Sequence, residues 1–391
     1  MKSILQLLAI FLISIGANAQ WTYPDSGITD DLNDVHFPTS NIGYAVGEGG
    51  SIIKSVDAGD SWTVLTSGVS SLLEGVHFLN DNLGYVVGDN VMLKTSNGGI
   101  NWTTVTLPET GHLMDVEFTN ATNGFCVGSD GILLKTSDAG LNWIAKNSDC
   151  NRYLSKIQFP SESVGYATSR GYNSNFIKTT DGGETWFSDT IDANLIYGSF
   201  ESVYFMTEDV GLIGSWYIYG LVKTTDGGAN WVDVSGPESP DLYSIDFANG
   251  SVGFAGDING LFMTTTDAGD NWTSETITPS ILALQALSAT EVICVGSDGA
   301  IAKKANATSS IEDEKQLNIN VFPNPSNGQF NISMNSNENK QIKVYTVDSK
   351  LIQQWTSSDY KTLIEIEQGT GVYFLEVMTN SSRETFKLIV K

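Results

Sequence analysis

Arginine and aromatic residues gather in a few short stretches of this sequence, and together their side chains could recognise a ligand. The residues are Arg152, Tyr153, Arg170, Tyr172, Trp216, Tyr217 and Tyr219. Aromatic rings offer flat surfaces with a polar edge, and arginine offers a fork of hydrogen-bond donors. Such side chains are typical anchors for a glycan or a peptide. We therefore predict a binding site here; the alternative is that the rings only pack between structural repeats.

Residues that could catalyse a reaction or hold a metal form no recognisable pattern. His36 and His77 recur at the same place in two repeats, and His112 stands in a loop with no visible partner. The three cysteines are an odd, sparse set that does not predict a disulfide framework. Cys126 and Cys294 match in repeat position and are expected to be small buried apolar residues. We predict no catalytic residue, no metal and no cofactor.

The charge balance excludes two classes of partner. Lysine and arginine number 20 and acidic residues 45, which gives a net charge of −25. A strongly acidic chain repels nucleic acid and anionic membrane surfaces. The balance fits an extracellular protein with a solvated acidic surface, or one that meets cations.

The N-terminus predicts export. Lys2 precedes an apolar stretch from Ile4 to Ile15, which is too short for a permanent membrane span. Ala17-Asn18-Ala19 is a small-x-small cleavage site, so we expect residues 1–19 to be a signal peptide and Gln20 to begin the mature chain. No cysteine follows the cleavage site, which argues against a lipoprotein, and no other stretch predicts a transmembrane segment.

A repeat of 40 to 45 residues organises most of the chain. Tryptophan marks it at positions 21, 62, 102, 143, 186, 231 and 272. Each unit contains short β-rich runs separated by Gly, Asn and Asp; the first has 32–37, 43–47, 51–54 and a run from Trp62. Four strands in a unit of this length predict one blade of a β-propeller.

The last unit is incomplete in a way that predicts ring closure. It has three strand patterns, at 282–288, 291–296 and 300–304, but no fourth. The mature chain begins with a spare Trp21-Thr22-Tyr23 segment that no other strands precede. We predict that this segment is the fourth strand, because closure removes open sheet edges. The fold class is therefore all-β, with a seven-bladed propeller at 20–304 closed by its N-terminal strand.

Six units carry the pattern [Ser/Thr]-x-[Asp/Asn]-x-Gly-x-x-Trp between their third and fourth strands. The acidic or amide residue and the tryptophan are Asp57 and Trp62, Asn97 and Trp102, Asp138 and Trp143, Asp181 and Trp186, Asp226 and Trp231, and Asp267 and Trp272. The Asp or Asn side chain can bond the backbone of its own turn, and the glycine permits a positive φ. We expect these residues to be structural; a calcium site is the lesser alternative.

This pattern resembles the Asp-box, or bacterial neuraminidase repeat, and the whole unit is similar to the photosystem II assembly and stability factor family. The resemblance covers residues 20–304 and implies a seven-bladed propeller in which the box is a fold element. It does not carry the family's function over, because fold does not imply function. Asp-box sialidases need an arginine triad, whereas the propeller region has only Arg152 and Arg170.

A second module follows a polar linker at 305–316. Residues 317–391 contain Phe322-Pro323-Asn324-Pro325, Asp348-x-Lys350-Leu351, Gly371-x-Tyr-x-Leu375 and a Lys387-to-Lys391 tail, within strands typical of a small Ig-like β-sandwich. This order resembles the type A sorting domain of the type IX secretion system. The resemblance implies a Bacteroidota-type bacterium, passage through the periplasm, and release from the cell or attachment to its surface. A plain adhesive sandwich is the alternative.

Two features of the expected second-to-third-strand loops bear on function. Five of the seven loops carry a carboxylate at Glu48, Asp89, Asp130, Asp257 or Asp298. These could form a negative mouth, although such residues also belong in hairpin turns. Blades 4 and 5 have longer loops, which hold the arginine and aromatic residues, and loops on a rigid scaffold often carry function.

Three functions are consistent with these patterns. The first is a secreted or surface non-enzymatic protein that binds an unknown protein or glycan. The second is a glycoside hydrolase, for which Asp192 and Asp241 are weak catalytic candidates. The third is an assembly factor for an envelope complex.

Overall fold

The computed structural model describes residues 19–171, 175–192, 194–218, 220–236, 240–306, 319–333, 339–346, 350–366, 368–378 and 383–391. The chain divides into two compact units, one spanning Asn18–Asn306 and one containing Ala307–Lys391. The expected signal peptide, apart from Ala19, and the expected linker from 307 onward lie outside the described residues. Among the described residues, no helix has the length and apolar character needed to cross a membrane.

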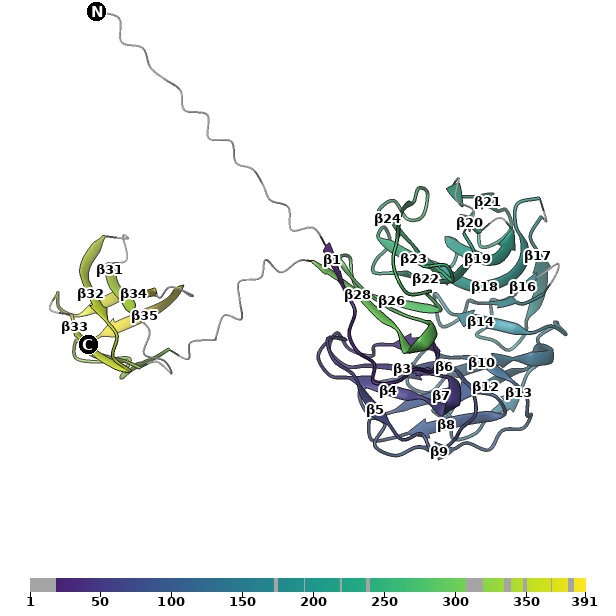
Figure 1. Ribbon diagram of the computed structural model, residues 1–391, viewed down its shortest axis with the longest axis horizontal. Coiled ribbons are helices and arrows are strands. Elements are labelled where there is room, and N and C mark those ends of the chain that lie inside the picture. Colours follow the sequence, from purple (N-terminus) through teal and green to yellow (C-terminus); the bar gives the residue numbers. More distant parts are fainter. Residues whose placement is uncertain are drawn as a thin grey trace, which may run out of the picture. The chain divides into compact units, whose positions relative to one another are not determined.

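Four-stranded antiparallel sheets follow one another along the first unit (Figure 1). Sheet 1 contains β2 (Leu32–His36), β3 (Gly43–Gly47), β4 (Ile52–Ser55) and β5 (Thr63–Leu65). Sheet 2 contains β6 (Leu73–Phe78), β7 (Gly84–Gly88), β8 (Val91–Thr95) and β9 (Thr103–Thr104). Sheet 3 contains β10 (Leu113–Phe118), β11 (Gly124–Gly128), β12 (Leu133–Thr136) and β13 (Ile144–Ala145).

Three further sheets repeat this order. Sheet 4 contains β14 (Leu154–Gln158), β15 (Gly165–Ser169), β16 (Asn175–Thr179) and β17 (Phe187–Thr190). Sheet 5 contains β18 (Tyr197–Phe205), β19 (Gly211–Ile218), β20 (Leu221–Thr224) and β21 (Val232–Asp233). Sheet 6 contains β22 (Leu242–Phe247), β23 (Gly253–Asp257), β24 (Leu261–Thr265) and β25 (Thr273–Thr276).

Sheet 7 combines the two ends of the unit. It contains β26 (Ala283–Ser288), β27 (Glu291–Val295), β28 (Ile301–Asn306) and β1 (Ala19–Thr22). Strand β1 runs antiparallel to β28, with Trp21 opposite Lys304, and Figure 1 shows these strands side by side. The Trp21 ring packs edge-on against Phe262 of sheet 6, with the ring centroids 4.8 Å apart. Short 3-10 turns η1 (Glu48–Gly50), η2 (Ser129–Gly131) and η4 (Ser297–Gly299) follow the second strands of sheets 1, 3 and 7.

The core lies between neighbouring sheets rather than within any one of them. Strands β3, β7, β11, β15 and β23 are buried at every position. Strands covered on both faces read as continuous apolar runs, which explains the Gly-Tyr-Ala-Val-Gly type of sequence. One buried cluster joins Tyr44 and Ile52 of sheet 1 to Phe78 of sheet 2, and another joins Leu32 of sheet 1 to Ile293 of sheet 7.

The Asp-box turns are closed by their own side chains. In sheet 3, the Thr136 hydroxyl accepts a hydrogen bond from the Gly140 amide and donates one to the Asp138 carboxylate, each at 2.9 Å. Asp138 also accepts bonds from the side chain and amide of Asn142, and these bonds lower the pKa of Asp138 to about 2. Trp143 then packs against Phe118 of the same sheet. The same hydroxyl-to-carboxylate or hydroxyl-to-amide bond occurs at Ser55 and Asp57, Thr95 and Asn97, Thr179 and Asp181, Thr224 and Asp226, and Thr265 and Asp267.

Third-strand lysines connect each box to the preceding sheet. Where the residue directly after the box glycine is acidic, the lysine forms an ion pair with it. Lys223 and Asp270 form such a pair, with a distance of 2.5 Å between the charged atoms. Where that residue is apolar, the lysine bonds a backbone carbonyl instead, as Lys94 does to Ala139 at 3.1 Å. The pair Lys303–Asp60 makes the same link from sheet 7 to sheet 1 at 2.5 Å.

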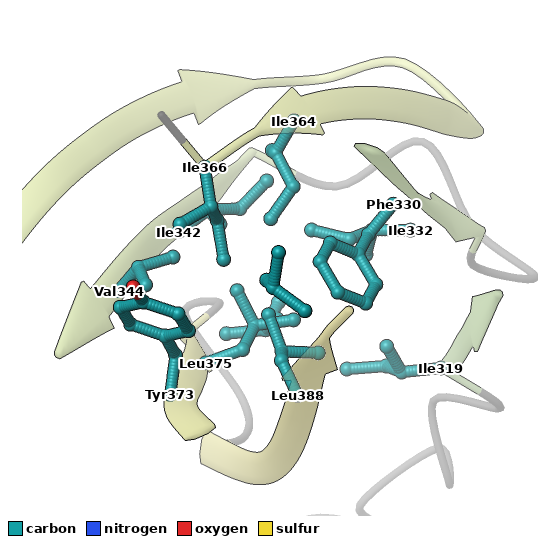
Figure 2. Close-up of a cluster of buried hydrophobic side chains, with 12 residues drawn as sticks. Ile319, Phe330, Ile332, Ile342, Val344, Ile364, Ile366, Tyr373, Leu375 and Leu388 are labelled. Carbon is teal, nitrogen blue, oxygen red and sulfur yellow. The ribbon is translucent and has the colours of Figure 1, made fainter. Parts of the chain in front are cut away.

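The second unit contains two antiparallel sheets that enclose one buried cluster. The first contains β29 (Asn320–Phe322), β30 (Gln329–Ser333) and β33 (Lys361–Glu365). The second contains β31 (Lys340–Thr346), β32 (Leu351–Ser357), β34 (Gly371–Met378) and β35 (Arg383–Val390). Figure 2 shows Phe330, Ile364, Val344, Tyr373 and Leu388 meeting in the core of this unit.

The Phe-Pro-Asn-Pro segment holds the last strand of this unit in place. The Asn324 side chain donates to the Lys387 carbonyl at 2.6 Å and accepts from the Ile389 amide at 3.0 Å. The Ser326 backbone bonds Ile389 and Lys391 in turn. The segment therefore holds the last strand, β35, which explains why this motif and the C-terminal tail occur together.

Candidate ligand-binding site

A polar cavity of about 270 Å³ lies among the first strands of the sheets in the first unit. It is lined by side chains of β2, β6, β10, β14, β18, β22 and β26. Each of these strands is the edge of its sheet. An edge strand presents backbone amides without a partner in its own sheet, and these amides need other acceptors.

Most of the polar side chains in this cavity supply those acceptors. Asp115 accepts a hydrogen bond from the Ile157 amide of the next sheet at 2.9 Å, and Asp246 accepts one from Ala286 at 2.8 Å. Gln285 of sheet 7 does the same for Phe37 of sheet 1 at 2.6 Å. Glu117, His36, Gln158, Asp34 and Ser244 make equivalent bonds. These side chains therefore hold neighbouring sheets together.

Burial sets the ionisation of the groups deep in the cavity. It raises the pKa of Asp246 to about 7 and that of Glu117 well above its ordinary value. It lowers the pKa of His36 to about 4, and His36 stacks on His77 with the ring centroids 4.7 Å apart. Burial thus favours the uncharged forms of Asp246, Glu117 and His36.

Lys156 lines both this cavity and a smaller neighbouring one, which we call the mouth. Its ammonium lies 3.4 Å from Asp34 and 3.8 Å from Asp115. Burial opposes protonation, but the two carboxylates outweigh it and raise the pKa of Lys156. Tyr243 also lines both cavities, and the mouth is further lined by Arg170 and Glu201.

Four of the predicted binding residues meet beside this mouth. The Arg170 amide donates to the Tyr153 carbonyl at 2.7 Å, and the Gly171 amide donates to the Ser199 hydroxyl at 3.0 Å. Ser199 lies opposite Trp216 in the β18–β19 pairing. Arg152 approaches Gly171, with its Nη1 3.5 Å from where a Cβ would stand. We call Arg152, Tyr153, Arg170 and Trp216, with His112 and Glu201, the mouth site.

Charge and exposed aromatic surface are combined in the mouth site. Arg170 pairs with Glu201 through Nε–Oε2 at 2.6 Å, and the Glu201 side chain is only 5% exposed. Trp216 is 42% exposed and Tyr153 38% exposed. Extended strands in sheet 5 explain the position of Trp216, because β18 and β19 continue for several pairs beyond the length of the other hairpins.

The remaining predicted binding residues are less well placed. Tyr217 lies opposite Gly198 in the β18–β19 pairing, next to Trp216 in the chain. Tyr172 and Tyr219 lie outside the described residues. Asp192, the candidate acid of the hydrolase hypothesis, is exposed and accepts a hydrogen bond from the Asn194 amide at 2.9 Å.

His112 is the residue that sequence reasoning missed. The prediction that it has no partner is wrong, because its Nε2 lies 2.8 Å from Glu74 and its Nδ1 lies 3.7 Å from Asp89. Its ring is also 5.8 Å from that of Tyr153. The Glu74 hydrogen bond raises the pKa of His112 in spite of partial burial. An alignment of the repeats could have indicated that Glu74 and His112 lie close together. In two adjacent repeats, Glu74 directly follows the first-strand leucine and His112 directly precedes it.

Three of the loop carboxylates, Asp130, Asp257 and Asp298, have a backbone role. Asp130 and Asp298 both have φ near 55°, and Gly49, with φ 62°, takes the same place in sheet 1. Asp is one of the few residues with a side chain that tolerates this left-handed conformation. Glu48 is therefore one position out of register with them, and Asp257 is buried and bonds its own turn. The hairpin-turn interpretation accounts for these positions better than a negative ring does.

Two family models match this chain. The secretion system C-terminal sorting domain matches residues 320–391. The photosynthesis system II assembly factor YCF48 matches residues 13–110 and 100–167. No curated protein matches the chain.

Solved structures show the same fold at low sequence identity. A structure of YCF48 bound to D1 peptide is 18% identical with a TM-score of 0.60, over 73% of this chain and 96% of that one. The GH74 enzyme of Niastella koreensis is 13% identical with a TM-score of 0.58, over 94% and 74%. PorZ, a surface component of the type IX secretion system of Porphyromonas gingivalis, is 12% identical with a TM-score of 0.53, over 93% and 59%.

Proposed function

We propose that this chain, a β-propeller with assembly-factor repeats and a C-terminal sorting domain, is a non-enzymatic binding protein of the bacterial cell surface or its surroundings. The sorting domain implies secretion to the outside of the cell. Under this proposal, residues 317–391 engage the type IX secretion machinery, residues 305–316 are a linker, and residues 20–304 bind a protein or glycan. The second unit would be an Ig-like sandwich.

The proposal includes a closed ring of seven blades, sheets 1 to 7. Three contacts between sheet 7 and sheet 1 support closure. The Leu32 amide bonds the Gly296 carbonyl at 3.0 Å, Lys303 pairs with Asp60, and Gln285 bonds Phe37. The β1–β28 pairing supplies the fourth strand of the last blade. A closed ring leaves only short, protected sheet edges, which suits a protein that has to survive outside the cell.

One observation carries the binding interpretation. Apart from His112, the side chains of the mouth site come from sheets 4 and 5 and the connections before them, where the repeat is broken. They combine the exposed rings of Trp216 and Tyr153 with the paired Arg170. Elsewhere, the repeated polar side chains are used to close turns or to join sheets. Exposed aromatic side chains at irregular positions of a rigid scaffold are the best candidates for ligand contacts.

The experiment is a binding screen of the full chain against glycans and cell-surface proteins. Trp216→Ala is expected to abolish or strongly weaken binding while leaving the thermal unfolding temperature unchanged. Binding that survives both Trp216→Ala and Tyr153→Ala would show that the ligand sits elsewhere.

A glycoside hydrolase is the second candidate, favoured by the carboxylates in the cavity and the shared fold of a GH74 enzyme. Against it, Asp115 and Asp246 already accept backbone hydrogen bonds with their carboxylates. Release of reducing ends from a polysaccharide panel, lost in Asp192→Asn or Asp241→Asn, would favour the hydrolase. An assembly factor would instead be retained on an envelope complex in a pull-down.

A further inference from the structure

Three cations around the mouth have carboxylate partners. Arg170 pairs with Glu201, His112 with Glu74, and Lys156 with Asp34, over distances of 2.6, 2.8 and 3.4 Å. Two of the acids, Glu74 and Glu201, have side chains only 15% and 5% exposed. The mouth site therefore holds donors and acceptors in fixed positions without a large excess of either charge.

This pairing disfavours ionic ligands. A ligand carboxylate at the other donors of Arg170 would lie close to the Glu201 carboxylate, and a ligand ammonium at Glu201 would lie close to the Arg170 guanidinium. Like charges so placed repel each other, and breaking the pair would leave the nearly buried Glu201 carboxylate uncompensated, which is costly. A hydroxyl group avoids that cost, because it can donate to a carboxylate and accept from an arginine at the same time.

The exposed rings supply the second requirement of a sugar site. Trp216 and Tyr153 leave about two-fifths of their surface open. The two residues are connected through Arg170, Gly171 and Ser199: the Arg170 amide bonds the Tyr153 carbonyl, the Gly171 amide bonds the Ser199 hydroxyl, and Ser199 pairs with Trp216 in the sheet. The faces of sugar rings carry C–H groups and stack on such aromatic surfaces, while sugar hydroxyls reach the polar groups between them.

We propose that the mouth site binds a neutral, hydroxyl-rich polysaccharide. One sugar ring stacks on Trp216, its hydroxyls bond the Arg170–Glu201 pair, and the chain continues toward Tyr153 and the His112–Glu74 pair. This inference rests on the proposed function and names its ligand class. Specificity arises because sugar hydroxyls can donate and accept hydrogen bonds at both members of an ion pair without adding a charge that would oppose either member.

The test measures retention of the full chain on immobilised polysaccharides, in three groups: neutral glucans and mannans, uronate-containing polymers, and sulfated polymers. Binding to a neutral polymer is expected, with little dependence on salt, since no charges are neutralised. Trp216→Ala should weaken it at least tenfold, and Arg170→Lys should weaken it by removing the planar fork. Phe187→Ala is the matched control, because Phe187 is 65% exposed on the outer strand β17.

The outcomes separate this inference from the proposed function. Stronger retention on uronate or sulfated polymers, with salt sensitivity, would overturn the neutral-sugar assignment and leave a binding protein. Retention of a purified surface protein instead, lost in Trp216→Ala, would do the same. If the binding of no ligand depends on Trp216, both the neutral-sugar assignment and the proposed function are overturned. Equal weakening by Trp216→Ala and Phe187→Ala would show a non-specific apolar effect and contradict the site.

Discussion

The two ends of the propeller unit use the same kinds of residue for different purposes. At the Asp-box end, each aspartate or asparagine bonds the hydroxyl and backbone of its own turn, and the adjacent tryptophan packs against the first strand of its sheet. At the mouth end, acids of one sheet pair with cations of another, as Glu201 of sheet 5 does with Arg170 of sheet 4, and Trp216 faces solvent.

This difference separates the regular positions, whose side chains stabilise the fold, from the irregular positions, whose side chains are available to recognise a ligand. A side chain that closes its own turn can be copied into every repeat without disturbing its neighbours. Some side chains that reach across sheets also recur, as the third-strand lysines do. The Arg170–Glu201 and His112–Glu74 pairs, in contrast, each occur at a single position of the array. Irregular positions in a regular array are therefore the informative ones.

The largest expected effect comes from breaking sheet 7, on which the proposed closed ring depends. Trp21→Ala removes the packing on Phe262 and the anchor of β1, and should lower the free energy of unfolding by about 3 kcal/mol. Tyr23→Ala is the control, because this ring is 54% exposed and should change stability by less than about 0.5 kcal/mol. Denaturant unfolding of both variants measures the difference. Equal stability would contradict closure by β1.

A smaller effect is expected at an Asp-box turn. Thr136→Val keeps the shape of a buried side chain but leaves the Gly140 amide without its acceptor, which should cost roughly 1–3 kcal/mol. Thr63→Val, at an exposed position of β5, should change stability little. If the two variants have the same free energy of unfolding, the box hydroxyl does not stabilise the turn. That result would contradict a stabilising role for the Asp-box end.

The smallest effect is electrostatic and can be followed at the chain's three histidines by NMR. His112 should titrate above 6.5, because Glu74 favours the protonated ring, whereas burial places His36 near 4 and His77 well below 6.5. The stabilising His112–Glu74 attraction is present below pH 6.5 and is lost as the pH rises through the raised pKa. Glu74→Gln should lower the pKa of His112 and leave the other two unchanged. A His112 pKa unaffected by this change would rule out the ion pair in solution.

The β-propeller and the sorting domain could be predicted from the sequence because their motifs are local. In the propeller, the motif is also repeated. Six boxes in register and a tryptophan period predict the blades, and the spare Trp21 segment predicts the β1–β28 pairing. The order of the C-terminal motifs predicts the sorting domain, which the family comparison bears out over residues 320–391. The clamp that Asn324 places on β35 is a long-range contact that no spacing revealed.

The mouth site was predicted only in part, for a physical reason. Long loops in sheets 4 and 5 pointed to Arg170 and Trp216, but nothing local connects Glu74 to His112, which are brought together by the packing of sheets 2 and 3. Likewise, the sequence could not show that Asp115 and Asp246 serve the backbones of neighbouring edge strands. Contacts between repeats follow from how sheets are stacked, which a pattern within one repeat does not encode.

The most direct test of this account is amide hydrogen exchange of the full chain with and without a bound neutral polysaccharide. The account predicts slowed exchange in the segments 152–153, 169–171 and 199–201 and around Trp216, with the Asp-box turns unchanged. Protection confined to the Asp-box turns, or spread evenly over all the sheets, would contradict the claim that recognition belongs to the irregular end.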